Sequence, residues 1–139
     1  MSHDHDHDDY GFEKDYWGTC CNTFDEDQKQ YVYARLMGLQ QRHWSIVVPD
    51  ISVLDIGGGP TSMLLKTTGL SHGKVVDPIE YPQWTRDRYH MMNIEVDVKK
   101  GEDVTDLWWD EVWIYNCMQH AVDPGLIIDN AKRAAKVLR

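Results

Sequence analysis

The chain has 139 residues, which is enough for one domain with a hydrophobic core. Hydrophobic residues make up 42% of the sequence and aromatic residues 11%, which excludes an intrinsically disordered chain. Fourteen basic and twenty-three acidic residues give a formal net charge of -9, so an extended phosphate backbone is disfavoured as the main partner and a small-molecule substrate is favoured.

Residues 1–9 alternate histidine with aspartate, which is typical of a disordered, solvated tail; loose binding of a divalent metal is the alternative. Residues 10–50 then combine an aromatic stretch with a helix from Thr23 to about Leu39, whose capping-box spacing predicts its start. This helix is expected to pack on the core. Just ahead of it, Tyr16 and Trp17 are candidates to cover a ligand.

The three cysteines, Cys20, Cys21 and Cys117, lack the spacing of a zinc knuckle and are expected to be reduced thiols. No apolar run approaches the roughly 18 residues of a membrane span, and no signal-peptide pattern opens the chain. The expected location is therefore the cytoplasm, with no membrane partner.

A short apolar run that ends in three glycines is the central feature of the sequence. The Pro49-Asp50 pair marks a boundary, and the run that follows predicts a buried strand of a parallel sheet over about residues 52–56. Residues 57–59 form a turn without side chains, where a ligand can approach the backbone. Pro60 suits the first position of a helix that reaches about Thr68.

An acidic residue follows the next predicted strand, which is short and covers residues 74–76. Asp77 lies twenty residues after Gly57 and is followed by Pro78, which ends the strand. An acid at the carboxyl end of a neighbouring strand can accept hydrogen bonds from both hydroxyls of a ribose. The glycine turn and Asp77 together predict a nucleotide-like ligand.

Two further strands and a last helix complete the pattern. A short irregular helix is expected over residues 81–89 and a third strand over 92–98. Residues 112–115 predict the fourth strand, and Asp123 caps a helix that continues to the end of the sequence. After the third strand, Glu102 or Asp103 could accept a hydrogen bond from an adenine amino group; an exposed acidic turn is the alternative.

From about Ile51 to Arg139 these motifs resemble the class I S-adenosylmethionine-dependent methyltransferases. The resemblance rests on the glycine turn with its preceding strand, on Asp77, and on the segment of residues 115–124. It implies an α/β fold in which a Rossmann-like parallel sheet, truncated to about four strands in the order 3-2-1-4, has helices on both faces and an N-terminal helix. It also implies that residues 51–139 form the cofactor-binding domain.

The resemblance implies roles for the residues of the turn. Gly57, Gly58 and Gly59 would let the methionine part of the cofactor lie on the backbone, and Asp55 would support the turn and the ammonium group. Thr61 departs from the family pattern, in which a third glycine is frequent.

The resemblance implies further contacts around the remainder of the cofactor. Asp77, with Pro78 beside it, would hold the ribose, and Glu102 or Asp103 would contact the adenine edge. Asn116 would lie beside the sulfonium and its methyl group. Transfer of this methyl group leaves S-adenosylhomocysteine as the product.

Methyl transfer from a sulfonium requires mainly alignment of the nucleophile, the methyl group and the sulfur. A base is needed only for a protonated acceptor, and His120 is the one well-placed candidate in the resemblance. A histidine bonded to the backbone at the start of the helix is the alternative.

The expected sheet has fewer strands than the seven that are usual in the family. Trp113 and Tyr115 would then stand on an open edge of the fourth strand, which predicts a homo-oligomer or a partner chain there. Two functions other than a methyltransferase stay open: a catalytically incomplete cofactor-binding module that acts through a partner, and a nicotinamide-binding Rossmann domain, for which Ser62 occupies the place of the third glycine.

Overall fold

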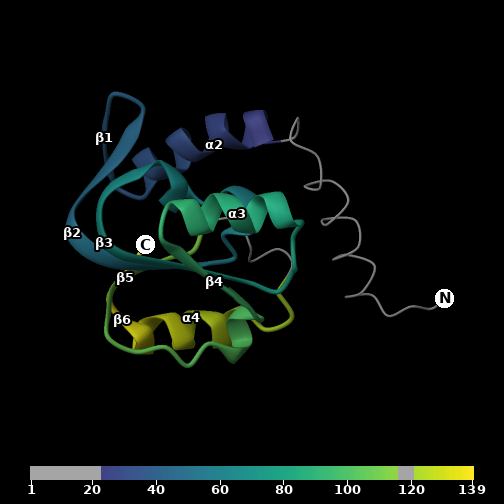
Figure 1. Cartoon of the computed structure of the whole chain (residues 1–139). Coiled ribbons are helices and arrows are strands. Elements are labelled where there is room, and N and C mark those ends of the chain that lie inside the picture. The colour runs from purple at the N-terminus through teal and green to yellow at the C-terminus, as the bar shows by residue number, and fades with distance from the viewer. Residues whose placement is uncertain (1–22, 116–120) are drawn as a thin grey trace.

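A parallel sheet forms the centre of the computed structural model, which describes residues 23–115 and 121–139. The strands follow the order β4-β3-β2-β5-β6, and β1 pairs with β2 outside this path (Figure 1). All pairs along the path are parallel, whereas β1 runs antiparallel to β2. The strands are β1 Gln40–Arg42, β2 Ser45–Ile56, β3 Thr67–Asp77, β4 Ile94–Val98, β5 Trp109–Trp113 and β6 Ala135–Leu138. The predicted α/β class and the 3-2-1-4 order of the first four parallel strands are confirmed.

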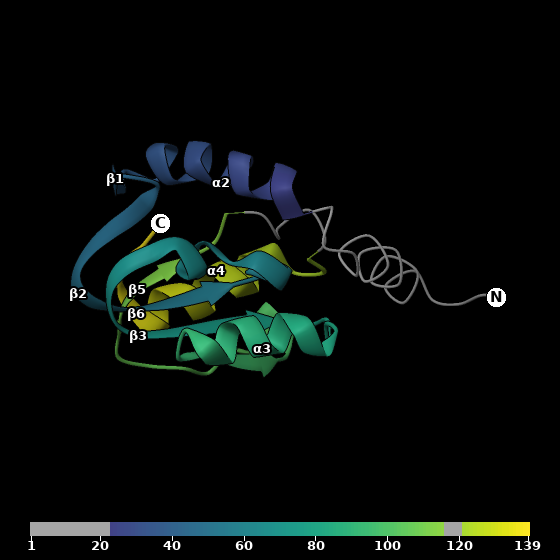
Figure 2. The same cartoon turned by 45° about the horizontal axis from the view of Figure 1, so that its top comes forward.

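Helices cover both faces of the sheet, as predicted. The helices are α2 Thr23–Leu36, α3 Gln83–Met91 and α4 Pro124–Ala134. Figure 2 shows the three helices around the sheet. Ala34 of α2 and Tyr89 of α3 belong to the core on one face, and Ile127 of α4 belongs to the core on the other. No helix of the described residues is long and apolar enough to cross a membrane.

The segment after the glycine turn is not the predicted helix. It forms two short 3-10 turns, Gly59–Thr61 and Met63–Lys66, and β3 begins directly afterwards at Thr67. Ser62 separates the two turns because its ψ of 151° is extended, and its hydroxyl accepts the Leu64 N–H. The side chain therefore competes with a continuous helix, as serine commonly does.

The strand before the glycine turn begins earlier than predicted. Pro49 and Asp50 do not precede β2 but lie inside it, at a register shift between Val47 and Ile51. Asp50 has a φ of 55°, a left-handed conformation that fits a bulge. Proline is tolerated at such an irregularity because no regular ladder hydrogen bond is required there.

The end of the last helix is a second correction. The helix stops at Ala134, and the next four residues form β6, which pairs with β5 from Trp109↔Ala135 to Val112↔Leu138. The edge of the fourth predicted strand is therefore covered within the chain, and Trp113 is 0% exposed. The predicted open edge at Trp113 and Tyr115 is wrong, since local periodicity could not show the pairing of residues 135–138.

Candidate functional site

The glycine turn lies at the carboxyl end of β2 and has two backbone conformations that favour glycine. Gly57 and Gly59 have φ angles of 78° and 73°. The Gly57 N–H donates to the Val76 carbonyl at 2.6 Å, which holds the turn against β3. A Cβ at Gly58 would lie 2.7 Å from Asp55 Oδ2, whereas a Cβ at Gly59 would meet no other part of residues 23–115 and 121–139 within 4 Å. The turn is packed from below at Gly58 and open at Gly59.

Asp77 lies beside the open face of the turn, as the sequence predicts. It ends β3 and is 8% exposed. Its Oδ2 accepts the Gly59 N–H at 3.0 Å, and its Oδ1 accepts the Ile79 N–H at 3.0 Å. Pro78, which lies between Asp77 and Ile79, is half-buried. The structure thus joins the two main motifs of the sequence through one carboxylate.

Asp55 lies under the turn and is completely buried. Its Oδ2 accepts a hydrogen bond from Tyr115 Oη at 2.6 Å and another from Ser62 Oγ. Its Oδ1 has no hydrogen-bond partner among the described residues. Burial raises the pKa of Asp55 to about 7, although the bonds from Ser62 and Tyr115 oppose this rise. The group therefore titrates near neutral pH.

Two tyrosine hydroxyls fix the segment that follows the turn. Tyr89 Oη on α3 donates to the Gly59 carbonyl at 2.5 Å and accepts the Ser62 N–H at 2.8 Å. Tyr115 Oη, just after β5, accepts the Met63 N–H at 3.0 Å while it donates to Asp55. The sequence did not identify these roles of Tyr89 and Tyr115. The position of Tyr115 at the end of a predicted strand is the one sequence feature that could have indicated its role.

A hollow opens beside Gly59 and Asp77, between α3 and the ends of β3 and β4. Most of its lining is apolar or aromatic and includes Ile79, Tyr81 and Val98. Thr85 also lines it, and the buried Thr85 hydroxyl has no hydrogen-bond partner among the described residues. Apolar walls with a few polar groups are typical of small-molecule sites.

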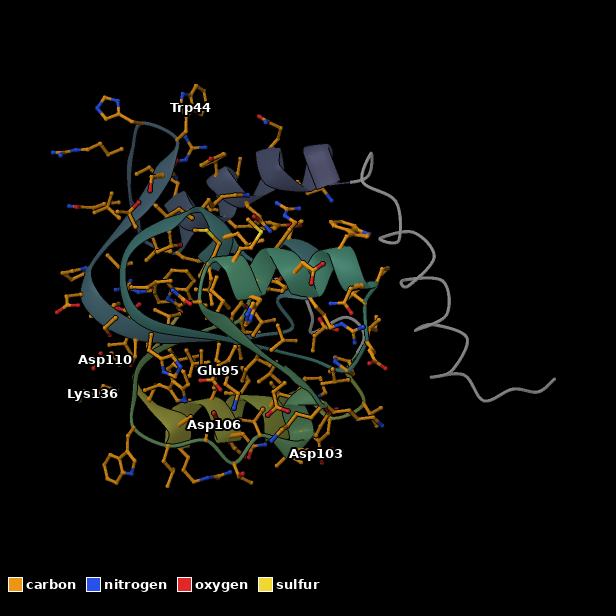
Figure 3. All side chains as sticks on the ribbon, in the orientation of Figure 1. Trp44, Glu95, Asp103, Asp106, Asp110 and Lys136 are labelled. Atoms are coloured by element: carbon orange, nitrogen blue, oxygen red, sulfur yellow. The ribbon has the colours of Figure 1, made fainter. Side chains whose placement is uncertain are left out.

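Glu102 and Asp103 lie at the short 3-10 turn Gly101–Asp103, which contacts α4. Glu102 Oε2 accepts the N–H groups of Val122 and Asp123 at 3.1 and 3.0 Å, so this carboxylate holds the start of α4. Asp103 is exposed there (Figure 3). Neither residue lines the hollow.

Four predicted site residues, Tyr16, Trp17, Asn116 and His120, lie outside the described residues, as does the histidine-aspartate tail. Within residues 23–115 and 121–139, no group of three or more metal-ligating side chains is close enough to hold an ion.

Solved methyltransferase structures match this fold, although no protein-family model and no curated protein matches the sequence. Phosphoethanolamine N-methyltransferase 1 of Haemonchus contortus, in complex with phosphoethanolamine and S-adenosylhomocysteine, matches with a TM-score of 0.64 and 19% identity; the match covers 100% of this chain and 33% of that one. A chain from the complex of the Haloferax volcanii Trm112 methyltransferase activator with a methyltransferase matches at 0.58 and 20% identity, over 94% of this chain and 53% of that one.

A third match is the 1,6-didemethyltoxoflavin-N1-methyltransferase of Burkholderia thailandensis, with its bound substrate and S-adenosylhomocysteine. Its TM-score is 0.58 at 13% identity, and the match covers 97% of this chain and 60% of that one. The chain thus spans between 33% and 60% of the length of these three matched chains.

Proposed function

Because the chain has the fold of class I S-adenosylmethionine-dependent methyltransferases, we propose that it binds S-adenosylmethionine across the glycine turn. We further propose that it provides the cofactor-binding part of a cytoplasmic enzyme that transfers the methyl group to a small-molecule acceptor and releases S-adenosylhomocysteine. The net charge of -9 supports an acceptor other than nucleic acid.

One observation carries this proposal: the open side of Gly59 lies directly beside the carboxylate of Asp77. The Gly59 N–H donates to Asp77 Oδ2 at 3.0 Å, and among the described residues no atom beyond the chain neighbours lies within 4 Å of the place where a Cβ would stand. A ligand can therefore approach the backbone and the acid at once. Ligands of open α/β sheets bind at this end of the strands.

The residues present fit the chemistry of the cofactor. The carboxylate oxygens of Asp77 are hydrogen-bond acceptors, which suits the hydroxyls of a ribose as donors. Glu102 or Asp103, at the short 3-10 turn Gly101–Asp103, remains proposed as the contact of the adenine edge. The Oδ1 atom of Asp55 is a buried acceptor without a partner among the described residues, which suits an ammonium group near the turn.

The cofactor supplies an activated methyl group on its sulfonium, and the protein's contribution to transfer is alignment and proton removal. Asn116 beside the sulfonium and His120 as the general base remain part of the proposal. His120→Ala should lower methyl transfer to an acceptor that must lose a proton, with the dissociation constant of the cofactor unchanged. Tyr16 and Trp17 remain proposed as a cover over the bound cofactor.

The direct test is equilibrium binding of radiolabelled S-adenosylmethionine to the wild type and to Asp77→Ala. We expect the variant to lose at least about tenfold in affinity, since a buried acceptor for the ribose is removed. Asp87→Ala is the matched control, because Asp87 is an exposed aspartate on α3 whose side chain accepts a hydrogen bond from its own helix neighbour Gln83. Equal affinities of a folded Asp77→Ala and the wild type would contradict the proposed site.

A cofactor-binding module that works through a partner is the second candidate. It is supported by the partial coverage of the matched chains and by the match from an activator complex. Methyl transfer by the isolated chain would exclude it. Thermal-shift titration with S-adenosylhomocysteine and with NAD separates both candidates from a nicotinamide-binding domain.

A further inference from the structure

Tyr115 connects three parts of the chain at one atom. It follows the end of β5, its hydroxyl donates to Asp55 at the end of β2, and the same oxygen accepts the N–H of Met63 in the segment after the turn. Burial raises the pKa of Tyr115 well above its usual value, and the neighbouring Asp55 carboxylate raises it further. The hydroxyl therefore stays protonated and remains a donor throughout the neutral pH range.

We propose that Tyr115 is a positioning residue whose hydrogen bond favours the ionised form of the buried Asp55 side chain beneath the glycine turn, and so sets the pH range in which the site accepts a cationic amino group. This inference rests on the proposed function, because it takes the ammonium of S-adenosylmethionine or S-adenosylhomocysteine as the group that Asp55 attracts.

The surroundings of Asp55 show why one hydroxyl has this influence. Its neighbours are Ser62 in the turn segment, Tyr115 after β5, Asp77 on β3 and Tyr89 on α3, and the Tyr33 ring of α2 contacts Tyr115 with 6.0 Å between centroids. Burial and the charge of Asp77 disfavour ionisation of Asp55, whereas the bonds from Ser62 and Tyr115 favour it. These two hydroxyls are the groups through which the structure lowers the pKa of this carboxyl.

Removing the Tyr115 hydroxyl should therefore raise the pKa of Asp55 above its present value of about 7. At pH values below the Asp55 pKa of both the wild type and the variant, the variant's affinity for the cationic ligand should be about tenfold lower for each unit by which its pKa is raised. Above both values Asp55 is ionised in either protein, and this loss should disappear. The titration of the ligand's own amino group affects the dissociation constants of both proteins equally, so it cancels in the ratio of the variant's constant to that of the wild type.

The experiment measures binding of S-adenosylhomocysteine to the wild type, Tyr115→Phe and Tyr89→Phe by calorimetry from pH 6 to pH 9. For Tyr115→Phe, we expect a ratio to the wild-type dissociation constant of about tenfold or more at pH 6 that declines toward one at pH 9. Tyr89→Phe is the matched control, because its hydroxyl bonds Gly59 and Ser62 and not Asp55. Its ratio should stay constant across the range.

A second measurement needs no ligand. A hydroxyl that stabilises only the ionised form of Asp55 contributes more to folding at high pH. The melting temperature of Tyr115→Phe should therefore fall further below that of the wild type as the pH rises from 6 to 9, and the deficit of Tyr89→Phe should not change. Ser62→Ala, which removes the other hydroxyl donor to Asp55, should reproduce the trend of Tyr115→Phe if that variant does not fold.

The outcomes separate the two ideas. A constant ratio for Tyr115→Phe, with a melting deficit independent of pH, overturns the role of Tyr115 even where the wild type binds the ligand. Absence of binding by the wild type overturns the proposed function, and with it the part of the inference that concerns the ligand. The melting series then still decides whether Tyr115 controls the charge of Asp55.

Discussion

Two groups of acidic residues in the same sheet are stabilised in different ways. At the carboxyl ends of β2 and β3, Asp55 and Asp77 are buried and accept hydrogen bonds from hydroxyl and backbone N–H groups. On β4 and before β5, Asp97 and Asp106 form ion pairs with Lys74, which we call the ion-pair cluster. Figure 3 shows Asp106 on the α4 side of the sheet.

The difference appears in the protonation of the two groups. Burial raises the pKa of Asp55 to about 7, because removal from water disfavours the charged form. Burial also acts on Asp106, but hydrogen bonds from Lys74 and Trp109 lower its pKa below the usual value. The ion-pair cluster therefore keeps its acid charged, whereas the candidate site holds an acid that can change its charge. A ligand-binding role is compatible with the second arrangement.

Asp55→Asn should have the largest effect on this contrast. An acid with a folded pKa of about 7 and an unfolded pKa near 3.8 stabilises the protein while it is protonated, and it loses that contribution as the pH rises from about 4 to 7. The shift amounts to ~4 kcal/mol. Asparagine does not titrate, so the free energy of unfolding of the variant relative to the wild type should rise by this amount between pH 4 and pH 7 in urea titrations.

Asp87→Asn, at an exposed position on α3, provides the control for this measurement. A difference between Asp55→Asn and the wild type that stays the same from pH 4 to pH 7 would show that Asp55 has an ordinary pKa.

Gly58→Ala should have the next largest effect. The added Cβ would lie 2.7 Å from Asp55 Oδ2 and 3.0 Å from Val75 Cγ1, and both neighbours are buried. Such overpacking costs up to about 3 kcal/mol. Gly59→Ala is its counterpart: its Cβ would meet no described residue within 4 Å beyond its chain neighbours, and its φ of 73° costs about 1–2 kcal/mol in alanine. Denaturant midpoints should rank Gly58→Ala below Gly59→Ala, and equal midpoints would contradict the packed and open sides of the turn.

The candidate site could be predicted where its signal is local. An apolar run before three glycines indicates a buried strand and a bare turn, and an acid at the end of the next strand indicates Asp77. The structure confirms that these two motifs meet, through the bond from Gly59 to Asp77. The strand order followed from the family resemblance and is confirmed as well.

The remaining features depend on contacts between distant residues. Ala135 and Leu138 continue the helical spacing of Ala131 and Ala134, so the sequence predicts one helix, whereas pairing with β5 makes residues 135–138 a strand. The bond between Tyr115 and Asp55 joins positions 60 residues apart. No periodicity records such a contact, and only the packed sheet brings the hydroxyl over the carboxylate.

Lys74→Met tests the other side of the comparison and should have a smaller effect. The substitution removes the cation that Asp97 and Asp106 share, whose distances to Lys74 are 3.3 and 3.0 Å, while Asp97 keeps its ion pair with Lys99 at 3.2 Å. Loss of charge-assisted bonds at a partly exposed site costs about 1.5 kcal/mol. Urea titration should show this loss, with the affinity for S-adenosylhomocysteine unchanged within about twofold. A loss of affinity as large as that of Asp77→Ala would show that the ion-pair cluster and the site are coupled.

The smallest expected effect lies at the hairpin between β1 and β2, far from both groups of acids. His43 and Trp44 have φ angles of 50° and 65°, a left-handed conformation that suits glycine, and the Trp44 side chain is 84% exposed at the tip (Figure 3). Trp44→Gly and Trp44→Ala both remove the edge-on contact with Tyr31. Only glycine also relieves the backbone, so its free energy of unfolding should exceed that of the alanine variant by about 1 kcal/mol. Equal stabilities would mean that the turn tolerates alanine without strain, and a change in cofactor affinity would place the hairpin in contact with the site.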